Sequence, residues 1–419
     1  MTIDFTTATF KDFENIPDYD IAQRADYFYQ FLDHMKSRGH MNYRLKNTSG
    51  TNATLNINIA DQNKEYVSFV SSDYLGFTQH PKVKQAAIDG IGKYGTGTGA
   101  TPLIGGYFDY HSALEKKIAG FFGRNEDEAV LFTTGYTANS ATLQILMQKE
   151  DIAILDMAVH ASVHEGCAFT NKKTFPHNNL EALEHILKMS ESTYRTKLVV
   201  VDGVYSQDGD TSRINEIYDL ARKYNAYIMV DDVHGVGILG ETGRGTLELA
   251  GLMDKVDFIT GTFSKTFGNL GGFVITNKKI ASFLKFQSRQ QIFSATAPPS
   301  SAGIVKAIDL IDEEPIWRER LWNNINYFKK GLDDMGLDTG ITCSAIIPVK
   351  IGDQNKMWDI GRILIEKGIY TNPIMYPAVA RKDARIRMSV TARHEKEHLD
   401  KTLNVFDDIN KKLHIAKKL

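Results

Sequence analysis

Short apolar runs alternate along the middle of the chain with segments whose apolar positions recur every three or four residues. Runs that are rich in β-branched residues and bounded by polar residues or glycine predict buried strands at Ala129–Phe132, Ile152–Leu155, Leu198–Val201, Tyr227–Val230, Phe258–Thr260 and Gly272–Thr276. Helical spacing lies between them, for example in Tyr136–Met147, Ile214–Lys223 and Ile280–Arg289. This repeated order predicts an α/β fold with a mostly parallel central sheet.

The pattern changes at Pro298–Pro299, which interrupts the chain. A long helical stretch is predicted from about Ser301 to Asp333, and strands are predicted near Ala345–Lys350 and Ile386–Ser389. We therefore expect an N-terminal arm over residues 1–60, a large α/β domain over residues 61–298 and a smaller C-terminal α+β domain over residues 299–419.

The N-terminal arm contains a predicted amphipathic helix near Ile21–Met35 that is rich in aromatic residues. Packing of this helix on its own protein or on a partner subunit is our main interpretation. A peripheral membrane contact is the alternative, although Lys36 and Arg38 give it little basic charge for attracting anionic lipid.

Composition narrows the class of protein. The 419 residues include 42% hydrophobic and 24% charged side chains, and the net charge is −2. This balance gives no bulk attraction for nucleic acid or an anionic membrane. The two cysteines cannot build a disulfide framework or a thiolate metal cage, no secretory signal or membrane span is recognisable, and we expect a cytoplasmic enzyme with no metal site.

Candidate catalytic residues follow the ends of predicted strands. Asp231 and His234 come directly after one strand, and Lys265 comes after the next strand along the chain. Ligands of open α/β sheets bind beyond the carboxyl ends of the strands. A lysine among apolar and hydroxyl residues is costly to bury as an ammonium group, which favours the neutral amine that Schiff-base chemistry needs.

The same set of residues meets the needs of pyridoxal 5′-phosphate. A lysine forms an imine with its aldehyde, and a carboxylate keeps its ring nitrogen protonated so that the ring accepts electrons. Gly135 opens a predicted helix after a strand, which suits the phosphate. Thr262 and Ser264 add hydroxyl donors, and His160 follows another strand, where it could stack on the ring. Each feature alone is weak, but their order along the chain favours this cofactor.

From about Asn56 to Leu413 the sequence resembles the α-oxoamine synthase family of pyridoxal-phosphate enzymes, which have the fold type I (aspartate-aminotransferase) architecture. The residues that carry the resemblance are Asp73–Gly76, Gly105–Tyr107 with His111, Thr134–Tyr136 with Asn139, His160–Ser162, Asp202–Ser206, Asp208–Asp210, Asp231–His234, Thr262–Lys265 with Gly271–Gly272, and Arg387. Within the family, His177–Asn179, Gly261–Lys265, Phe293–Ala295, Asn372–Pro373 and Pro377–Val379 are most similar to the bacterial serine palmitoyltransferases.

The resemblance implies a role for each catalytic candidate. Lys265 would carry the cofactor and later move a proton, and Asp231 would pair with the pyridinium nitrogen. His234 would donate to the ring oxygen, and His160 would stack on the ring and orient the substrate carboxylate. The remaining cofactor-binding candidates are Gly135, Tyr136, Ser206, Thr262, Ser264 and, from the neighbouring subunit of a homodimer, Ser294.

Substrate-binding candidates are Arg387, by a bidentate pair with the amino-acid carboxylate, together with Ser72 and Asp73. The implied reaction is a decarboxylative condensation of an amino acid with an acyl thioester of coenzyme A or acyl carrier protein. Condensation of serine with palmitoyl-CoA is the leading prediction. The alternatives are a cysteate fatty acyltransferase, an 8-amino-7-oxononanoate synthase, a 2-amino-3-ketobutyrate CoA ligase and, more distantly, a non-catalytic scaffold subunit, which the retained Lys265 disfavours.

Three features depart from the family pattern or compete with it. Ser72 stands where the family usually has Asn, and Gly99–Pro102 replaces a usual Ser-Arg pair. Arg381, Lys382 and Arg385 make one segment unusually basic, which indicates either a solvated surface or a preference for a substrate with an extra anion such as cysteic acid. Gly95–Gly99 superficially resembles a dinucleotide-binding loop, but it follows a predicted helix rather than a strand, which argues against an oxidoreductase.

Overall fold

The computed structural model describes residues 3–59 and 61–416, and the chain divides into two compact units. The large unit comprises Ser72–Ser206 and Asp210–Glu319. The small unit comprises Met1–Ser71, Gln207–Gly209 and Arg320–Leu419, so it joins the two ends of the chain. The domain boundaries that we predict at residues 60 and 298 stay a prediction.

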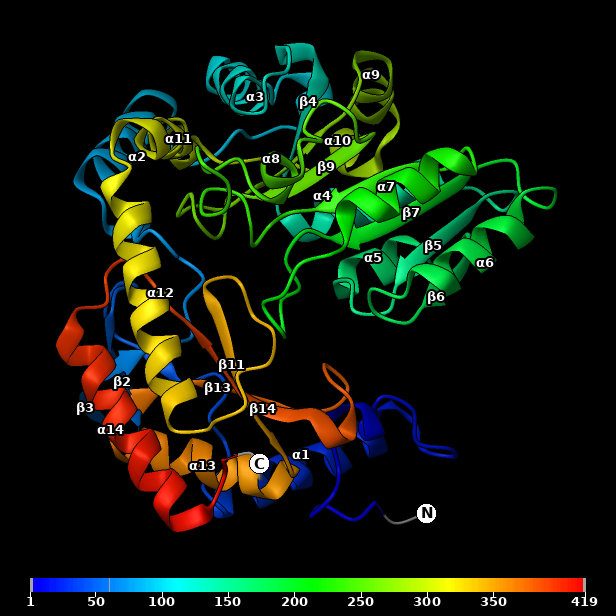
Figure 1. Cartoon of the computed structure of the whole chain (residues 1–419). Helices are drawn as coiled ribbons and strands as arrows, with labels where there is room; N and C mark the ends of the chain where they lie inside the picture. Colours follow the sequence, from blue (N-terminus) through cyan, green and yellow to red (C-terminus); the bar gives the residue numbers. More distant parts are fainter. Residues whose placement is uncertain (1–2, 60, 417–419) are drawn as a thin grey trace. The chain divides into compact units, whose positions relative to one another are not determined.

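A seven-stranded sheet forms the centre of the large unit, in the order β4-β10-β9-β8-β7-β5-β6 (Figure 1). Strand β10 runs antiparallel to both of its neighbours, and the pairs from β9 to β6 are parallel. This confirms the predicted mostly parallel sheet. The strands are β4 (Ala129–Phe132), β5 (Ile152–Asp156), β6 (Asn171–Phe175), β7 (Lys197–Asp202), β8 (Tyr227–Asp231), β9 (Phe258–Thr262) and β10 (Gly272–Ile275).

Helices connect these strands and cover the sheet. They are α2 (Pro81–Tyr94), α3 (Asp109–Phe121), α4 (Gly135–Leu146), α5 (Ala161–Gly166), α6 (Leu180–Ser190), α7 (Ile214–Lys223), α8 (Thr246–Ala250), α9 (Lys278–Gln287), α10 (Arg289–Phe293) and α11 (Ala302–Glu313), with 3₁₀ turns η2 (Phe77–Gln79), η3 (Pro102–Ile104), η4 (Glu126–Glu128) and η5 (Pro299–Ser301). The glycine-rich run Gly95–Gly99 follows α2, as expected.

The long helical stretch predicted after Ser301 is two helices, α11 and α12 (Ile316–Asp334). The break falls at Pro315, because proline lacks the amide hydrogen that a helix interior needs and its ring clashes with the preceding turn. The apolar spacing continues through both helices, which is why periodicity alone did not reveal the break.

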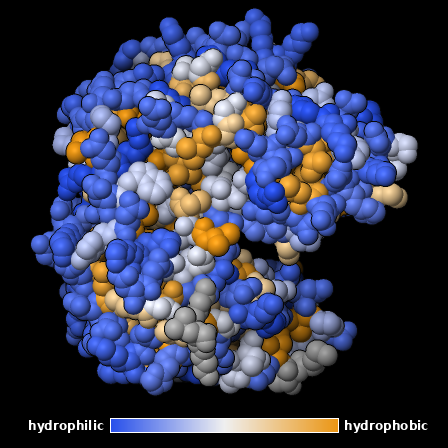
Figure 2. All heavy atoms as spheres, in the orientation of Figure 1, coloured by the Kyte–Doolittle hydropathy of each residue, from blue (hydrophilic) through white to orange (hydrophobic). Residues whose placement is uncertain are grey.

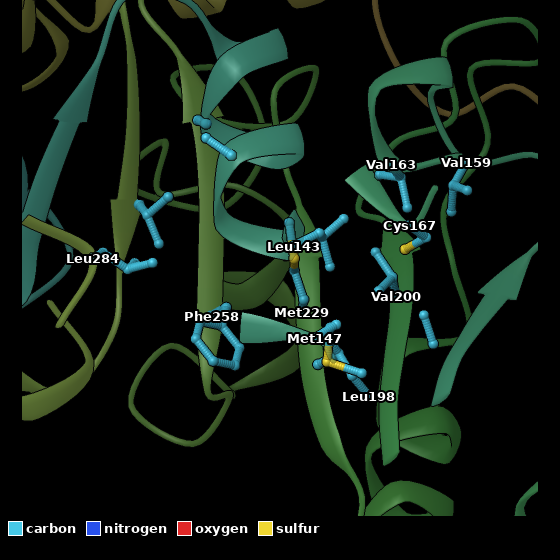
Figure 3. Packing of buried hydrophobic residues seen from close by; sticks show 14 of the residues in the cluster. Leu143, Met147, Val159, Val163, Cys167, Leu198, Val200, Met229, Phe258 and Leu284 are labelled. Carbon is cyan, nitrogen blue, oxygen red and sulfur yellow. The ribbon is translucent and has the colours of Figure 1, made fainter. Parts of the chain in front are cut away.

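The core of the large unit lies between the sheet and helices α4, α5 and α9. Leu143 of α4 and Met147, which directly follows that helix, pack with Leu198 and Val200 of β7 and with Met229 of β8 (Figure 3). These side chains are nearly inaccessible to water. The continuous apolar character of the strands reflects burial on both faces, which is typical of parallel sheets.

The small unit contains two sheets. One has the order β1-β2-β3-β12 and the other the order β11-β14-β13. The strands are β1 (Lys46–Asn47), β2 (Thr54–Ile59), β3 (Gln62–Ser68), β11 (Ile346–Gly352), β12 (Ile369–Tyr370), β13 (Asn372–Ile374) and β14 (Ala384–Ser389). Its helices are α1 (Ile21–Ser37), most of α12, α13 (Gln354–Glu366) and α14 (Lys396–Leu413), with 3₁₀ turns η1 (Phe10–Phe13) and η6 (Arg381–Asp383).

The aromatic residues of the N-terminal arm pack against one another. Phe13 and Phe31 stack with ring centroids 4.8 Å apart, and Phe5 approaches Phe31 edge-on. Tyr29 instead is 58% exposed. Packing on the arm's own protein is therefore the interpretation that these contacts support, while a membrane contact stays a prediction. Within the described part of the chain, no helix combines the length and apolar character needed to cross a bilayer.

Most of the surface in the view of Figure 2 is hydrophilic, with hydrophobic residues in small groups. Exposed apolar side chains in the large unit include Ile104, Phe286 and Phe293. Scattered exposed apolar residues are ordinary for globular proteins and do not indicate a binding site by themselves.

We expect Leu198→Ala to destabilise the large unit by about 2–5 kcal/mol, because removing a buried leucine leaves a cavity between β7 and its covering helices. Leu198 is 1% exposed, whereas the control residue Leu249 in α8 is 65% exposed. Leu249→Ala should change stability by less than about 0.5 kcal/mol. Urea denaturation followed by fluorescence measures both variants, and equal midpoints would contradict the assignment of Leu198 to the core.

Candidate active site

The strand register brings the candidate residues to one edge of the large sheet. Asp202 of β7 pairs with Asp231 of β8, and Asp231 pairs with Thr260 of β9. Because the strands run in parallel, the segments that follow them meet at their carboxyl ends. The segments after β4, β5, β7, β8 and β9 carry Gly135, His160, Ser206, His234 and Lys265, respectively.

Lys265 contacts His234 directly. Its Nζ lies 2.7 Å from His234 Nε2, and the other ring nitrogen, Nδ1, lies 2.6 Å from the Tyr74 hydroxyl. Tyr74 and His234 are buried, and Lys265 is half-buried. The imidazole therefore connects the amine to a phenol, which gives a continuous path of exchangeable protons at Lys265 Nζ.

Asp231 is buried at the end of β8 and is held by two donors. The Asn139 side-chain amide donates to its Oδ2 at 2.6 Å, and the Val233 backbone amide donates to its Oδ1 at 3.2 Å. Asn139 is fixed in turn, because its oxygen accepts from the Thr260 hydroxyl at 2.7 Å. These contacts leave little rotational freedom to the carboxylate, as a group that must face one ring nitrogen requires.

His160 lies close to both charged groups of the site. Burial lowers the pKa of His160 below its ordinary value; Asp231 opposes this shift and Lys265 reinforces it. The ring is therefore neutral at pH 7 and offers a face for stacking. Its Nδ1 lies 2.8 Å from the Ser162 hydroxyl, which fixes the ring at the start of α5.

The start of α4 provides donors for a phosphate. The amides of Thr137 and Ala138 donate to Thr134, which leaves those of Gly135 and Tyr136 at the open end of the helix, within the residues that the structure describes. A Cβ atom on Gly135 would lie 2.8 Å from Thr262 Cβ, so only glycine lets the helix start approach this strand end so closely. The Thr262 hydroxyl donates to the Gly271 carbonyl and accepts from the Ser264 amide.

These features fit pyridoxal phosphate in kind. An amine, a buried carboxylate, a neutral imidazole and a helix start are present at one edge of one sheet. Tyr136 is partly exposed and its hydroxyl bonds Glu165, while Ser264 is exposed and Ser206 is half-buried. The contacts predicted for these three residues with the phosphate and the ring stay predictions.

Two predicted substrate contacts and one predicted contact from a neighbouring subunit also stay predictions. Asp73 is buried and already accepts from the Phe77 and Thr78 amides and from the Thr78 hydroxyl, so its carboxylate stabilises its own turn. Ser72 is half-buried beside it. Ser294 donates to the adjacent Ala295 carbonyl.

Arg387 belongs to the small unit. It lies in β14, is buried, and donates to the Ser389 hydroxyl at 3.2 Å. Two of the neighbouring basic residues are paired within the same unit: Arg381 with Asp12 at 3.3 Å and Arg385 with Asp208 at 2.6 Å. These pairings weaken the idea of a freely available basic rim in this segment.

Two further aspartates of the sheet edge resist ionisation. Burial and the nearby charge of Asp231 raise the pKa of Asp202 well above its usual range. Burial also raises the pKa of Asp232 to about 7, although the Thr246 amide that donates to it opposes this shift. Asp231 is thus one of several acidic groups in a small volume.

Tyr74 and Asn139 are functional candidates that the sequence did not single out, although both lie in segments that carry the family resemblance. The signal for Asn139 was its spacing: it lies four residues after Gly135 on α4 and thus on the same side of the helix as the start. Tyr74 gave no local signal, because its partner His234 is 160 positions away.

Comparison with known proteins shows the family of the chain. The model of the family "Aminotransferase class I and II" matches residues 64–406. The 8-amino-7-oxononanoate synthase of Alkaliphilus metalliredigens is 38% identical over 353 residues, which cover 84% of this chain and 89% of that protein. The 8-amino-7-oxononanoate synthase 1 of Bacillus subtilis is 39% identical over 375 residues, which cover 89% and 93%.

Among solved structures, serine palmitoyltransferase from S. paucimobilis with bound pyridoxal phosphate and myriocin matches with a TM-score of 0.89 at 29% identity. The match covers 95% of this chain and 100% of that one. Fold, site and relatives therefore agree that the chain belongs to the α-oxoamine synthases, pyridoxal-phosphate-dependent acyltransferases of fold type I.

Proposed function

We propose that this enzyme condenses an amino acid with an acyl thioester in the manner of 8-amino-7-oxononanoate synthase. The observation that carries the reaction class is the Lys265–His234 contact beside Asp231 at the carboxyl edge of the large sheet. The identity of 38–39% to proteins of that name supports this substrate pair over the serine and palmitoyl-CoA pair that the sequence motifs favoured.

The name of the product states which substrates are joined. The product is a nine-carbon acid with a ketone at carbon 7 and an amino group at carbon 8. Carbons 1 to 7 form the acyl group, which ends in the ketone, and carbons 8 and 9 form a two-carbon fragment that carries the amine. Alanine supplies that fragment, and its carboxyl group leaves as carbon dioxide once the new carbon–carbon bond has formed. The thiol of the acyl thioester is the other leaving group, so atoms balance without an oxidant or reductant.

The bound cofactor supplies an aldehyde that forms imines with amines and a ring that accepts the electron pair left by the lost α-proton. Lys265 Nζ would hold the cofactor through its aldehyde, and as a free amine it would take the proton from the α-carbon of the amino acid. His234 and Tyr74 carry its proton. Asp231, fixed by Asn139, would face the ring nitrogen and keep it protonated, and His160 would orient the substrate carboxylate.

A serine palmitoyltransferase-like activity is the second candidate, because the structural match with that enzyme extends over nearly the whole chain. The longer acyl chain would then require an apolar channel. Cysteate remains a weaker candidate, since Arg381 and Arg385 already have carboxylate partners within the small unit.

We expect Lys265→Ala to lower kcat by at least roughly 100- to 10,000-fold, the usual contribution of a positioned proton carrier. Borohydride reduction followed by peptide mass analysis should place the cofactor on Lys265 in the unmodified enzyme and nowhere in the variant. Lys255→Ala removes an exposed lysine and serves as the control. A variant that still releases the thiol at the normal rate would refute the assignment.

The substrate pair is tested by crossing four amino acids with two thioesters. Alanine, serine, glycine and cysteic acid are each combined with pimeloyl and palmitoyl thioesters, thiol release is followed by absorbance, and products are identified by mass. We expect alanine with the pimeloyl thioester to give the highest kcat/KM. A higher value for serine with palmitoyl-CoA would replace our proposal with the second candidate.

For Arg387→Ala we expect the KM for the amino acid to rise roughly 10- to 100-fold with a smaller change in kcat, since hydrogen bonds to charged groups contribute about 1.5–3 kcal/mol. Arg387→Lys should fall between, because lysine keeps the charge but not the bidentate geometry. Arg38→Ala, at an exposed position of the small unit, is the control. An unchanged KM would remove Arg387 from the substrate site.

A further inference from the structure

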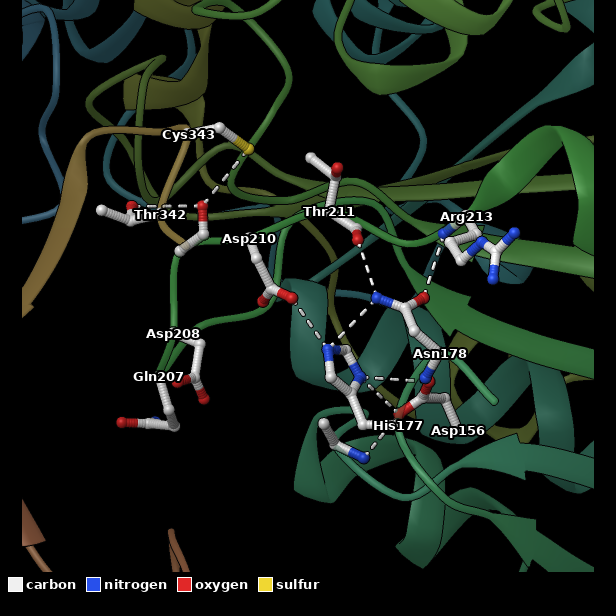
Figure 4. A network of polar contacts seen from close by, with 12 residues as sticks. Asp156, His177, Asn178, Gln207, Asp208, Asp210, Thr211, Arg213, Thr342 and Cys343 are labelled. Atoms are coloured by element: carbon white, nitrogen blue, oxygen red, sulfur yellow. Dashed lines mark hydrogen bonds and ion pairs between the residues drawn. The ribbon is translucent and has the colours of Figure 1, made fainter. Parts of the chain in front are cut away.

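His177 joins the segments that follow two strands of the large sheet. Its Nδ1 lies 3.1 Å from Asp156 Oδ1, at the end of β5, and its Nε2 lies 2.8 Å from Asp210 Oδ2, in the segment after β7 (Figure 4). The two carboxylates are almost fully buried, at 0% and 5% side-chain exposure, while His177 is 30% exposed. The sequence motif His177–Asn179 thus occupies a defined place that the proposed chemistry does not use.

The arrangement favours a charged ring. Each imidazole nitrogen faces a carboxylate, and an ionised carboxylate accepts hydrogen bonds but does not donate them. Both nitrogens must therefore carry a proton to satisfy both partners. A buried carboxylate without a cation or donors is costly, so the positive ring stabilises both acids at once.

Backbone contacts extend the connection on both sides. The Asn178 amide donates to Asp156 Oδ2 at 2.9 Å, and its side chain donates to the Thr211 carbonyl and accepts from the Arg213 amide. The Tyr205 amide donates to the Asp210 carbonyl, and the Tyr205 ring meets the His177 ring edge-on with centroids 4.3 Å apart.

The two connected segments carry candidate cofactor residues. The turn after Asp156 leads through Ala158, whose amide donates to that carboxylate, directly to His160. The segment after β7 runs from Asp202, which accepts weakly from the His160 amide, to Ser206. The position of one segment against the other therefore sets where His160 and Ser206 meet a bound ring.

We propose that His177 is a positioning residue whose cationic ring holds the His160 and Ser206 segments together in the arrangement that pyridoxal phosphate needs. The proposal rests on the assignment of His160 and Ser206 to the cofactor, and not on which amino acid or thioester reacts. A protein that binds the cofactor but fails the condensation assay would thus refute the proposed function and leave this inference standing.

The test compares full-length His177→Gln with the unmodified protein. Glutamine cannot supply a positive charge, and we expect the apparent Kd for pyridoxal phosphate to rise about 10-fold or more, as expected when a charge-assisted hydrogen bond is lost. Absorbance titration of the apo-protein gives the Kd. The visible circular dichroism of the bound cofactor should also weaken, because it depends on how His160 contacts the ring. His185→Gln, at an exposed position in α6, is the matched control.

The pH dependence separates charge from general stability. Burial would lower the pKa of His177, but hydrogen bonds and charge from Asp156 and Asp210 raise it to about 10 from 6.5. The contribution of this charge to folding stability is therefore fully present below pH 6.5 and is lost as pH rises through about 10, whereas the ring of the folded protein keeps its charge until the pH nears 10. The titratable groups that face the ring are Asp156, Asp210 and Tyr205, with Asp202 in electrostatic range of Asp156.

We accordingly expect the ratio of the two Kd values to be constant between pH 7 and about pH 9 and to approach one above about pH 10, since groups shared by both proteins cancel in the ratio. A thermal midpoint that falls in His177→Gln while Kd and the dichroism stay unchanged would overturn the proposal, because His177 would then only stabilise the fold.

A second variant covers the case in which His177→Gln does not fold. Asp210→Asn keeps the side-chain size and leaves the contact between His177 and Asp156, so it weakens only the connection to the Ser206 segment. A raised Kd with a weaker dichroism supports the proposal. Asp210→Asn protein with the normal Kd and dichroism overturns it.

Discussion

The carboxyl edge of the large sheet concentrates acidic side chains where water cannot reach them, and much of the site depends on how these charges are satisfied. Asp156, Asp202 and Asp231 end the neighbouring parallel strands β5, β7 and β8, Asp232 follows β8, and all four are buried. A buried carboxylate is tolerated only with hydrogen-bond donors, a cation or a bound proton. The four carboxyl groups are stabilised in different ways. The way in which each one is stabilised indicates whether its role is chemical or structural.

Asp232 illustrates the structural solution. Backbone surrounds it so closely that Cβ atoms on Gly203, Gly235 or Gly245 would approach its oxygens to between 2.0 and 2.3 Å. Glycine at these positions lets the chain wrap the carboxyl group and present the Thr246 amide to it. Asp231, next to it in sequence, instead accepts from the Asn139 side-chain amide and from the Val233 backbone amide.

The connection through His177 is a third solution and has a geometric consequence. One imidazole contacts two acids on segments that follow different strands, so a single side chain links these segments. His234 has a similar arrangement, because its imidazole contacts both the Lys265 amine and the Tyr74 hydroxyl. Cofactor enzymes need this kind of fixed geometry, because the reactivity resides in the cofactor and the protein contributes orientation.

The sequence alone determined the strands of the large sheet, apart from β6, and β11 and β14 of the small unit to within two residues at either end. Buried parallel strands are continuous apolar runs, so they stand out, whereas β6 (Asn171–Phe175) lies at the sheet edge and is largely polar. The order of Gly135, His160, Asp231 and Lys265 was also readable, because each follows its own strand.

Only the tertiary structure decided which residues share hydrogen bonds. Tyr74 with His234, Asn139 with Asp231, and His177 with Asp156 and Asp210 are pairs whose members lie 21 to 160 positions apart, and no local periodicity relates them. Local pattern reports which face of an element is buried. Strand order and register determine which residues of different strands contact one another, and packing over the whole sheet sets both.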